Sequence, residues 1–305
     1  MLKTLKNLEI LLKYKHMRSK EWRGKILEQR IKNRKNYMQG PKSSQQQWQT
    51  YGRLFKVALN GRKNSVILIL GSTPELRDLA LSYKNSKLIT ADLNPDMISG
   101  MSELMKFKNS KREAILIREW SKMKVKENSL DLIAGDAAMV NLNLKQLHAF
   151  FSLASRALKP GGKIVLREAV RVSKLILPPE SIIKKSREEK WHWFDLHAFL
   201  CFGSSGKWYN KKTFKNFMAV FYKWAEKEFF EKKFTKEEYK KLRAWKGNLV
   251  HSILPEKKFQ GIFHEFFIPL KVNQPNDLRY QKFIKFFFGE KYGKAHTEIH
   301  KKQLR

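Results

Sequence analysis

The stretch VILILGSTPELRDLALSYKNSKLITAD, from Val66 to Asp92, decides the fold of this chain. Its first residues, Val66–Leu70, form a short apolar run that is typical of a strand buried on both faces of a parallel sheet. Gly71 ends this run, and the residues after it predict a helix start. Lys87–Ala91 reads as a second strand with Asp92 at its carboxyl end. An acid about 20 residues beyond such a turn is the arrangement with which nucleotide-binding α/β proteins hold a ribose.

The turn after the first strand fits two helix caps and one kind of ligand. Ser72-x-x-Glu75 matches a capping box, whereas a cap at Thr73 would place Pro74 at the first helical position. The turn has a single glycine and no P-loop lysine, and Pro74 removes a backbone N–H that a phosphate would use. It therefore favours an adenosine ligand without a pyrophosphate, and S-adenosylmethionine is such a ligand.

Length and composition restrict the class of protein. The chain has 305 residues, enough for one large core or for a core with a smaller partner. No apolar run approaches the roughly 20 residues that span a bilayer, and the basic N-terminus lacks an apolar signal core. Cys201 is the only cysteine, which excludes intramolecular disulfides and cysteine-based metal clusters. We expect a cytoplasmic protein with no metal site and no membrane partner.

The formal net charge of +35 has two interpretations. RNA or another polyanion would bind a basic surface through the release of counterions from its phosphates. Compositional drift is the alternative, because lysines outnumber arginines and are spread along the whole chain. The charge by itself does not choose between the two.

The order of the following elements predicts a parallel sheet. Further strands are expected within Lys111–Arg118, Asn128–Asp136 and Lys163–Glu168. A helix is expected over Leu144–Leu158, ended by the breakers Lys159–Gly162. Five strands alternating with helices predict an α/β fold with a doubly wound, mostly parallel sheet.

The sequence divides into four units. They are a basic helical N-terminal extension (1–60), the core (61–175), a helical and aromatic cap insertion (176–258), and closing strands with a C-terminal tail (259–305). Gln45–Asn60 is expected as a helix with an aromatic stripe that packs on the core or lies across the ligand cleft. Thr213–Glu231 and Thr235–Trp245 are expected as cap helices, the second with a Thr235-x-x-Glu238 capping box. Gln260–Val272 is expected as strand.

Five segments resemble a known family. LILGSTPEL, ITADLNPDMI, REW, NSLDLIAGD and ALKPGGKIVLRE occur in the order and spacing found in class I S-adenosylmethionine-dependent methyltransferases, which have a Rossmann-like fold. The resemblance covers residues 64–170, and its most specific pieces are ALKPGGKIVL and the acid after the second strand. The chain departs from the family pattern in two places. The glycine-rich loop is reduced to Gly71–Pro74, and Ile69 and Leu70 stand where an acid is usual.

The resemblance implies a set of cofactor-binding residues at the strand ends. These are Gly71, Ser72, Thr73, Asp92, Leu93, Glu119, Trp120, Gly135 and Asp136. Gly71, Ser72 and Thr73 would line the methionine and ribose. Asp92 would accept hydrogen bonds from both ribose hydroxyls, and Leu93 would pack on the adenine. Glu119 and Trp120 would meet the adenine edge, and the last two residues would lie beside the methyl group. Structural alternatives stay open for the acids: Asp92 as a helix cap, Glu119 as a surface acid, and Asp136 as the cap of the next helix.

The catalytic residue is not identified by the sequence. Methyl transfer from a sulfonium depends mainly on positioning and desolvation, and it needs a base only when the acceptor arrives protonated. The weak candidates are Asp136 and three residues of the stretch WHWFDLHAFLCF, namely His192, Asp195 and His197. That stretch is interpreted either as an acceptor pocket or as an amphipathic helix whose aromatic side chains pack.

The sequence therefore predicts a methyltransferase that uses S-adenosylmethionine on an undetermined acceptor, with a small molecule preferred. An RNA methyltransferase that uses the basic surface is one alternative. A non-catalytic binding protein that keeps the Rossmann-like fold is the other. The sequence does not indicate an oligomeric state.

Overall fold

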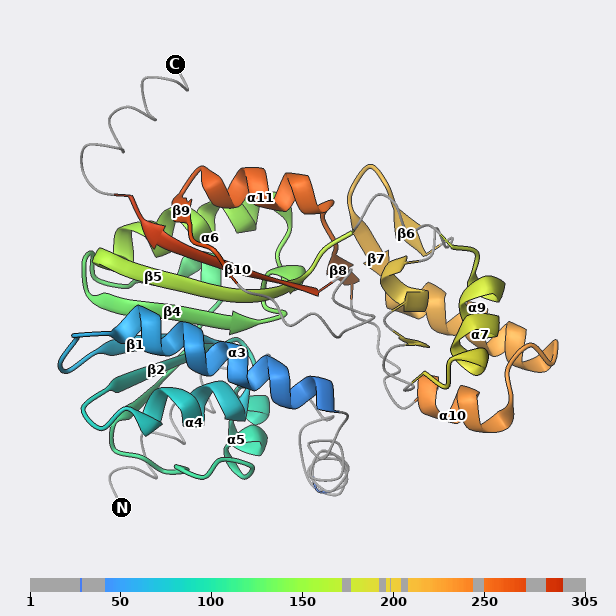
Figure 1. The fold of residues 1–305 in the computed structure, drawn as a ribbon, viewed down its shortest axis with the longest axis horizontal. Helices are drawn as coiled ribbons and strands as arrows, with labels where there is room; N and C mark the ends of the chain where they lie inside the picture. The colour runs from blue at the N-terminus through green and yellow to red at the C-terminus, as the bar shows by residue number, and fades with distance from the viewer. Residues whose placement is uncertain are drawn as a thin grey trace.

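A seven-stranded sheet forms the core of the computed structural model, which describes residues 28, 42–171, 177–191, 196–197, 199–203, 208–243, 250–272 and 284–292 (Figure 1). Its strand order is β3-β2-β1-β4-β5-β10-β9. β1 to β5 are parallel, β10 pairs antiparallel with β5, and β9 pairs antiparallel with β10. This arrangement confirms the doubly wound, mostly parallel α/β fold. The strands are β1 (Val66–Leu70), β2 (Lys87–Asp92), β3 (Glu113–Ile117), β4 (Leu130–Asp136), β5 (Leu158–Ala169), β9 (Phe267–Pro269) and β10 (Ile284–Lys291).

The strand order reverses at β1, which has β2 on one side and β4 on the other. In register, Leu70 lies opposite Ala91 on β2 and opposite Gly135 on β4. The loops that follow these three strands therefore meet at one edge of the sheet. In open α/β sheets this point is where ligands bind.

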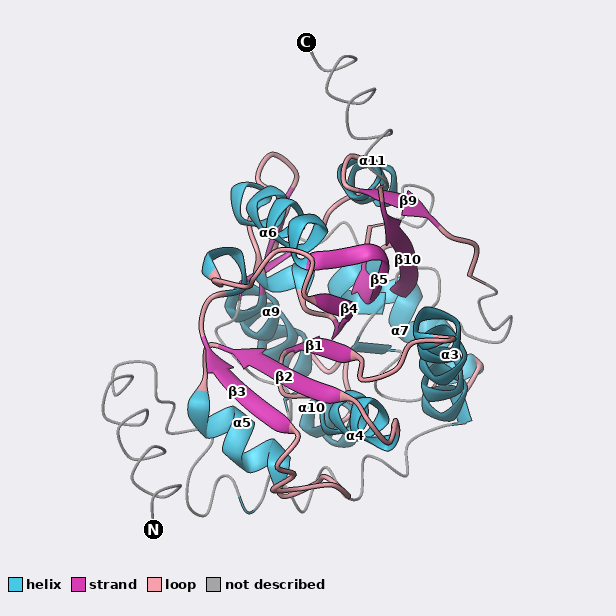
Figure 2. Ribbon diagram, turned by 90° about the vertical axis from the view of Figure 1, so that its left-hand side faces the viewer, coloured by secondary structure: helices cyan, strands magenta, loops and turns pink. Residues whose placement is uncertain are grey.

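Helices cover both faces of the sheet (Figure 2). α3 (Lys42–Leu59) and α4 (Pro74–Ser82) pack on one face, and α6 (Leu144–Ala157) and α11 (Glu256–His264) on the other. Alternate residues of β1 pack against the helices on the two faces of the sheet: Ile67 and Ile69 face α3, while Leu68 and Leu70 face α6. All four are at most 1% exposed, and each such burial contributes roughly 1.5–3 kcal/mol before entropy costs.

The predicted helix over Gln45–Asn60 is confirmed as α3. Its aromatic stripe packs into the core, where Tyr51 and Phe55 are fully buried and Tyr51 stacks with Trp48. The residues before Lys42 lie outside the described residues apart from Glu28, so the remainder of the N-terminal extension stays a prediction.

The cap contains several helices and a small sheet. Its elements are α7 (Pro179–Glu188), the π-helical turn η5 (Phe199–Gly203), β6 (Tyr209–Asn210), β7 (Lys215–Phe217), α9 (Met218–Phe230), α10 (Lys236–Arg243) and β8 (Val250–Ser252). β6, β7 and β8 form an antiparallel sheet that the sequence does not predict. The helix expected from Thr213 begins only at Met218, because Lys215–Phe217 pairs with β8. The capping box of Thr235 and Glu238 is confirmed by both of its hydrogen bonds.

The closing segment differs from its prediction. Gln260–Val272 was expected as strand, but its first part belongs to α11, and only Phe267–Pro269 forms β9. The helix forms because Phe259, Ile262 and Phe263 recur at helical spacing and bury against the α6 layer. The later aromatic run supplies β10, the antiparallel strand that joins β5. The boundaries of the four units stay predictions.

Candidate active site

The turn between β1 and α4 lies at the carboxyl edge of the sheet. Gly71 has a φ of +86° there, in the left-handed region that favours glycine. A Cβ atom built on Gly71 would find only a carbon of Trp120, at 4.0 Å, so the space at the turn is open. α4 begins with Thr73 as its cap and Pro74 at its start, while Thr73 makes no side-chain capping bond. The alternative capping box of Ser72 does not form, because the Ser72 hydroxyl donates to a different acid, at the end of β2.

That acid is Asp92, which is 8% exposed. Its Oδ2 accepts the Ser72 hydroxyl at 3.0 Å, and its Oδ1 accepts the Asn94 backbone N–H at 2.9 Å. Burial raises the pKa of Asp92, and the hydrogen bonds from Asn94 and Ser72 oppose that rise. Asn94, not Asp92, caps α5 (Pro95–Ser102), so the carboxylate is not used as a helix cap. Each carboxylate oxygen keeps a lone pair that can accept a ribose hydroxyl.

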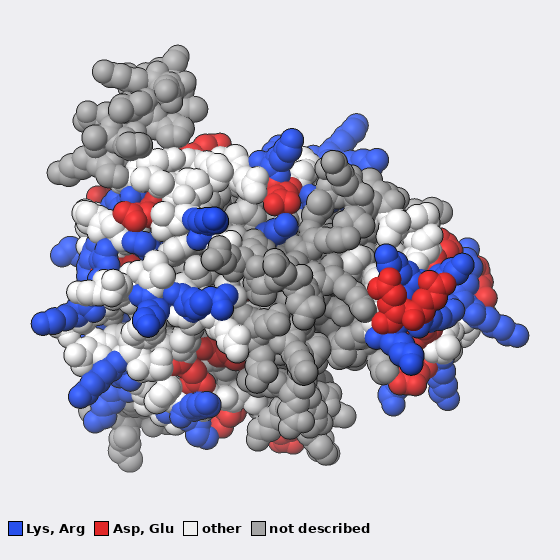
Figure 3. All heavy atoms as spheres, viewed as in Figure 1, with Lys and Arg blue, Asp and Glu red and all other residues white. Residues whose placement is uncertain are grey.

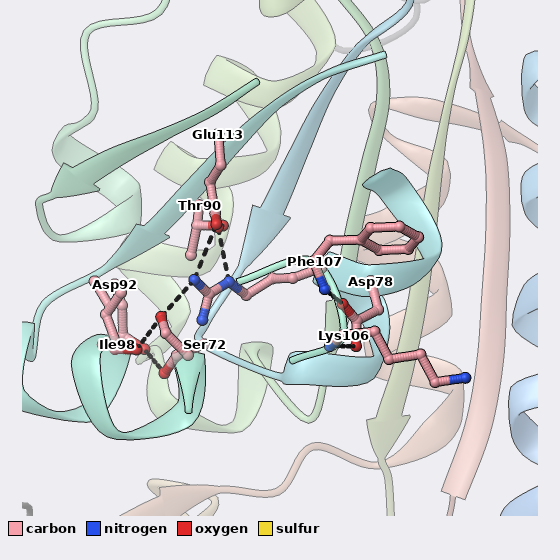
Figure 4. A network of polar contacts seen from close by, with 10 residues as sticks. Ser72, Asp78, Thr90, Asp92, Ile98, Lys106, Phe107 and Glu113 are labelled. Atoms are coloured by element: carbon pink, nitrogen blue, oxygen red, sulfur yellow. Dashed lines mark hydrogen bonds and ion pairs between the residues drawn. The ribbon is translucent and has the colours of Figure 1, made fainter. Parts of the chain in front are cut away.

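A buried network supports Asp92 from the side of α4 (Figure 4). Arg77 is 1% exposed and donates to both oxygens of Glu113, at 2.7 and 3.1 Å, and to Ser102 at 2.8 Å. The Thr90 hydroxyl donates to the same Glu113 carboxylate at 2.6 Å. The network joins α4, α5, β2 and β3, and the Arg77 charge lowers the pKa of Asp92 against the larger effect of burial. It fixes the elements that carry the acid.

Leu93 and Trp120 border the same edge on the expected adenine side. Leu93 follows Asp92 and is 43% exposed, which leaves an apolar surface for a flat ring. Trp120 begins the short helix η3 (Trp120–Lys122), so its backbone N–H has no partner within that helix. Its indole N–H donates to the Ala91 carbonyl at 2.7 Å, and the Gly71 N–H donates to the same oxygen at 2.8 Å. The Ala91 carbonyl oxygen of β2 therefore connects the glycine turn with η3 through two hydrogen bonds.

Glu119 is placed between η3 and the start of α6. Its carboxylate accepts from Ser121 at 2.6 Å, from Lys122 at 2.7 Å and from Gln146 at 2.9 Å. The hydrogen bonds from Lys122 and Ser121 lower the pKa of Glu119 to about 2. The group is ionised at neutral pH and anchored by its neighbours, and its contact with an adenine stays a prediction.

At the end of β4, Asp136 is held by residues from two other elements. Its two oxygens accept from Arg167 of β5 at 2.7 and 2.9 Å. Arg167 also donates to Gln47 of α3, and the Tyr51 hydroxyl donates to the Gly135 carbonyl at 2.8 Å. Asp136 does not cap the following helices, whose caps are Ala138 and Asn143. This bidentate ion pair with Arg167 fixes the orientation of the Asp136 carboxylate.

Gly135 is required by packing. A Cβ atom at this position would lie 3.2–3.3 Å from side chains of Ala138, Leu166 and Leu70, which is closer than ordinary contact. A larger residue would push β4 away from its neighbours. This gives Gly135 a structural reason that is independent of any ligand.

Glu168 and Arg167 were missed by the sequence reasoning. Glu168 is fully buried, and it accepts the backbone N–H groups of Ala138 and Met139 at 3.0 and 3.1 Å. Burial raises its pKa to about 8. These contacts attach β5 to η4 (Met139–Asn141), the short helix after β4. The available signal was the charged pair Arg167-Glu168 directly after the apolar residues Ile164–Leu166.

Of the three candidate catalytic residues in the cap, the structure describes only one. His192 and Asp195 lie outside the described residues. His197 is 8% exposed within the cap, with its Nε2 3.2 Å from the Tyr222 hydroxyl. Burial lowers the pKa of His197 to about 4. It is a neutral imidazole inside the cap core.

The cap meets the core beside the end of β4. β8 packs against η4, and Ile253, just after β8, forms an apolar cluster with Val140 and Ala169. The Arg171 N–H donates to the Leu254 carbonyl at 2.8 Å, which continues the contact along the chain after β5. Figure 1 shows the cap beyond the carboxyl end of β4. The cap therefore borders the edge that carries Asp92 and Asp136.

Together, the strand order and the oriented Asp92 carboxylate define an α/β protein that carries a buried acid at the edge where open α/β sheets bind ligands. Residues 67–247 match the model of the Methyltransferase domain family. The chain belongs to this family and is a class I S-adenosylmethionine-dependent methyltransferase, with S-adenosylmethionine as its cofactor. No curated protein matches it in sequence.

Solved structures with a similar fold have low sequence identity. The PH0226 protein of Pyrococcus horikoshii is 12% identical over 83% of this chain and 93% of its own, with a TM-score of 0.51. The N-methyltransferase NodS of Bradyrhizobium japonicum, solved with S-adenosylhomocysteine, is 12% identical over 79% of this chain and 85% of its own, with a TM-score of 0.44. The first of these likenesses supports the fold and nothing further.

The residues at the edge fit this cofactor. Asp92 offers two oriented oxygens, the turn at Gly71 is open, and Leu93, the next residue after Asp92, exposes an apolar surface. Among the described residues, no group of His, Cys, Asp and Glu side chains could hold a metal ion. The described helices include none that is long and apolar enough to cross a membrane.

Proposed function

We propose that the enzyme methylates a small molecule bound between the carboxyl edge of the sheet and the cap. The observation that carries this proposal is the packing of β8 against η4, which follows the strand that ends in Asp136. An acceptor held there would be enclosed by the cap on one side and by the cofactor site on the other. Such enclosure excludes water and favours a small substrate over a large one.

Each residue of the edge has a proposed part. S-adenosylmethionine, when bound, supplies an electrophilic methyl group on a sulfonium. Asp92 holds the ribose hydroxyls, and Ser72 orients Asp92 through their 3.0 Å hydrogen bond. Gly71 and Thr73 line the methionine end, Leu93 supports the adenine, and the Trp120 backbone N–H meets its ring.

Asp136 is proposed as an orienting group for the acceptor. Both of its oxygens already accept hydrogen bonds from Arg167, which fixes the orientation of the carboxylate. Its remaining lone pairs can still accept a hydrogen bond from an O–H or N–H of the acceptor. We therefore assign Asp136 to positioning and do not assign it as the general base.

The charge on one face of the molecule supports a small acceptor over RNA. On the face in Figure 3, Lys and Arg side chains stand dispersed over the core and are mixed with acids on the cap. RNA binding would be favoured by a continuous basic surface at the cleft. The net charge of +35 keeps an RNA acceptor as the second candidate. Cys201 is a buried free thiol, which agrees with the cytoplasmic location that we propose.

The first experiment is calorimetric titration with S-adenosylhomocysteine. We expect binding by the wild type and a loss of about 100-fold in Asp92→Asn, because two hydrogen bonds to a charged group are weakened. Asp78→Asn is a matched control, since Asp78 likewise accepts two hydrogen bonds, from the backbone N–H groups of Lys106 and Phe107 at 2.9 and 3.0 Å. Figure 4 shows these contacts apart from Asp92. A wild type that does not bind would refute the cofactor site and leave a non-catalytic binding protein.

The acceptor class is tested with a labelled methyl donor. The enzyme is incubated with the low-molecular-weight fraction and, separately, with the RNA fraction of a cell extract. Label in the small-molecule fraction supports the proposal. Label that appears only in RNA would replace it with the second candidate.

A further inference from the structure

Polar side chains converge inside the apolar core of the cap. Its core residues come from α7, η5, α9, α10 and the segments between them, with Trp208 and Phe221 among the most deeply buried. Within this core the Asn216 side-chain amide donates to the Cys201 carbonyl at 2.6 Å, and the Cys201 sulfur lies 3.6 Å from Nε2 of His197. A polar group inside such a core costs free energy unless it is hydrogen-bonded.

On the small sheet of the cap, two buried polar atoms have no hydrogen-bond partner among the described residues. They are Oδ1 of Asn216, a residue that is fully buried, and Nδ1 of His251. Asn216 on β7 and His251 on β8 are directly opposite each other in the antiparallel pair. Side chains at opposite positions start about 5 Å apart and lie on the same face of the sheet. The two atoms therefore form one enclosed feature, whose unmade hydrogen bonds a single bound group could complete.

This feature lies toward the seam between cap and core. Side chains two residues apart on an extended segment share a face, so Ile253 continues the face of His251. Ile253 packs against Val140 of η4, whereas Asn216 reaches inward to Cys201. His251 is only partly exposed. A molecule at the seam, next to the loop after β4, could reach both atoms.

We propose that Asn216 and His251 form a subsite for the hydroxyl or amino group of a small uncharged methyl acceptor. This inference rests on the function proposed above. Asn216 Oδ1 can only accept a hydrogen bond, so the bound group must be an O–H or N–H donor. The imidazole of His251 can donate to or accept from the same group, which suits a hydroxyl or an amine.

Charge and shape narrow the class of ligand. Burial lowers the pKa of both His197 and His251, so both rings are neutral near pH 7. A carboxylate or phosphate would gain no positive charge from them, and its lone pairs would face the Asn216 oxygen. Phe221 has ring contacts with His197 and Trp208 at centroid distances of 5.6 and 5.2 Å. An aromatic alcohol therefore has the chemistry of this site.

The test uses phenol as the probe and benzoate as its charged counterpart. The full chain is saturated with S-adenosylhomocysteine, and imidazole signals are followed by NMR during titration. We expect phenol to shift the His251 signals in a saturable way, and benzoate to leave them unchanged. Phenol affinity should fall about tenfold in Asn216→Ser and in His251→Phe, because one buried hydrogen bond is lost. His148→Phe is the matched control, since His148 lies on α6 and is 44% exposed.

The outcomes separate the subsite from the cofactor site. S-adenosylhomocysteine binding is measured for each variant and should be unchanged, so failure of that binding in the wild type would count against the methyltransferase function and not against the subsite. Should Asn216→Ser fail to fold, the wild-type titration and a crystal structure with phenol still decide. A phenol hydroxyl within hydrogen-bond distance of both atoms supports the proposal. An ordered water between them that phenol does not displace, with no saturable shift, overturns it.

Discussion

Buried polar groups are hydrogen-bonded differently in two regions: the carboxyl edge of the sheet, where we propose that the cofactor binds, and the interior of the cap. At the edge, both oxygens of Asp92 are oriented by hydrogen bonds, and Glu113 accepts from Arg77 and Thr90. In the cap, Asn216 and His251 each keep an atom without a partner within the described part of the chain. Arg77 has one such nitrogen as well, but its other donors are used. The edge is thus largely organised by its own contacts, whereas the cap leaves hydrogen bonds for a ligand to complete.

This difference fits the two tasks of a methyltransferase. A cofactor site that serves every turnover gains from preorganisation, because little ordering then has to occur on binding. A subsite for the acceptor gains specificity from buried groups that remain unpaired when the wrong molecule enters. We expect the edge to govern stability and cofactor affinity, and the cap to govern the choice of acceptor.

The largest effect is expected from breaking the buried ion pair of the edge. Arg77 and Glu113 have side chains that are 1% and 7% exposed, whereas the matched pair Arg187–Glu238 in the cap is 47% and 20% exposed. Arg77→Met should lower the free energy of unfolding by about 3–5 kcal/mol, because Glu113 is left as a buried charge. Arg187→Met should cost less than about 1 kcal/mol. Urea unfolding measures both.

A double variant checks the cause of this loss. Glu113→Gln added to Arg77→Met removes the stranded charge and should restore part of the stability. Equal losses in Arg77→Met and Arg187→Met would contradict the difference in burial on which the comparison depends.

The second prediction concerns Glu168, which connects the edge to η4 and so to the cap. Its pKa is raised by burial from the ordinary 4.5 to about 8, so the folded state binds the proton more tightly than the unfolded state. The stability from this proton is fully present below pH 4.5 and is lost as the pH rises through 8. The loss is at most about 5 kcal/mol.

Glu168→Gln should remove this part of the pH dependence. The unfolding free energy of the wild type should fall between pH 5 and 9 more steeply than that of the variant, as measured by urea unfolding across that range. Glu103→Gln is the control, because the Glu103 side chain is 58% exposed. Parallel curves for the wild type and Glu168→Gln would show that the Glu168 carboxyl is not protonated in the folded state.

Much of the edge could be predicted because its signals are local in the sequence. The strand–turn–helix–strand unit and the position of Asp92 depend on residues within one or two elements, as does the capping box at Thr235 in the cap. The competition at Ser72 could not be settled locally. Its hydroxyl had a helix to cap and an acid 20 residues away to orient, and the tertiary contact prevailed.

The parts that were missed depend on contacts between distant residues. Asp136 and Arg167 are 31 residues apart, and Arg167 and Gln47 are 120 apart. The β7–β8 pairing likewise joins Lys215–Phe217 to Val250–Ser252, and these short strands have no pattern that reveals their partner. In α11 the aromatic run was compatible with strand or helix, and packing against α6 decided for helix. Such choices become visible only in three dimensions.

The smallest predicted effect is a change in cofactor affinity when Trp120 is replaced, with Trp208 as the residue for comparison. The Trp120 indole N–H donates to Ala91 at 2.7 Å beside the glycine turn, and the Trp208 indole N–H donates to Cys201 at 3.4 Å in the cap. Trp120→Phe should weaken S-adenosylhomocysteine binding by about 2- to 10-fold, since one hydrogen bond that holds the turn is lost. Trp208→Phe should lower stability through lost packing and leave that affinity unchanged. Calorimetric titration and urea unfolding measure the two quantities, and an equal loss of affinity in both variants would mean that the cap also organises the cofactor edge.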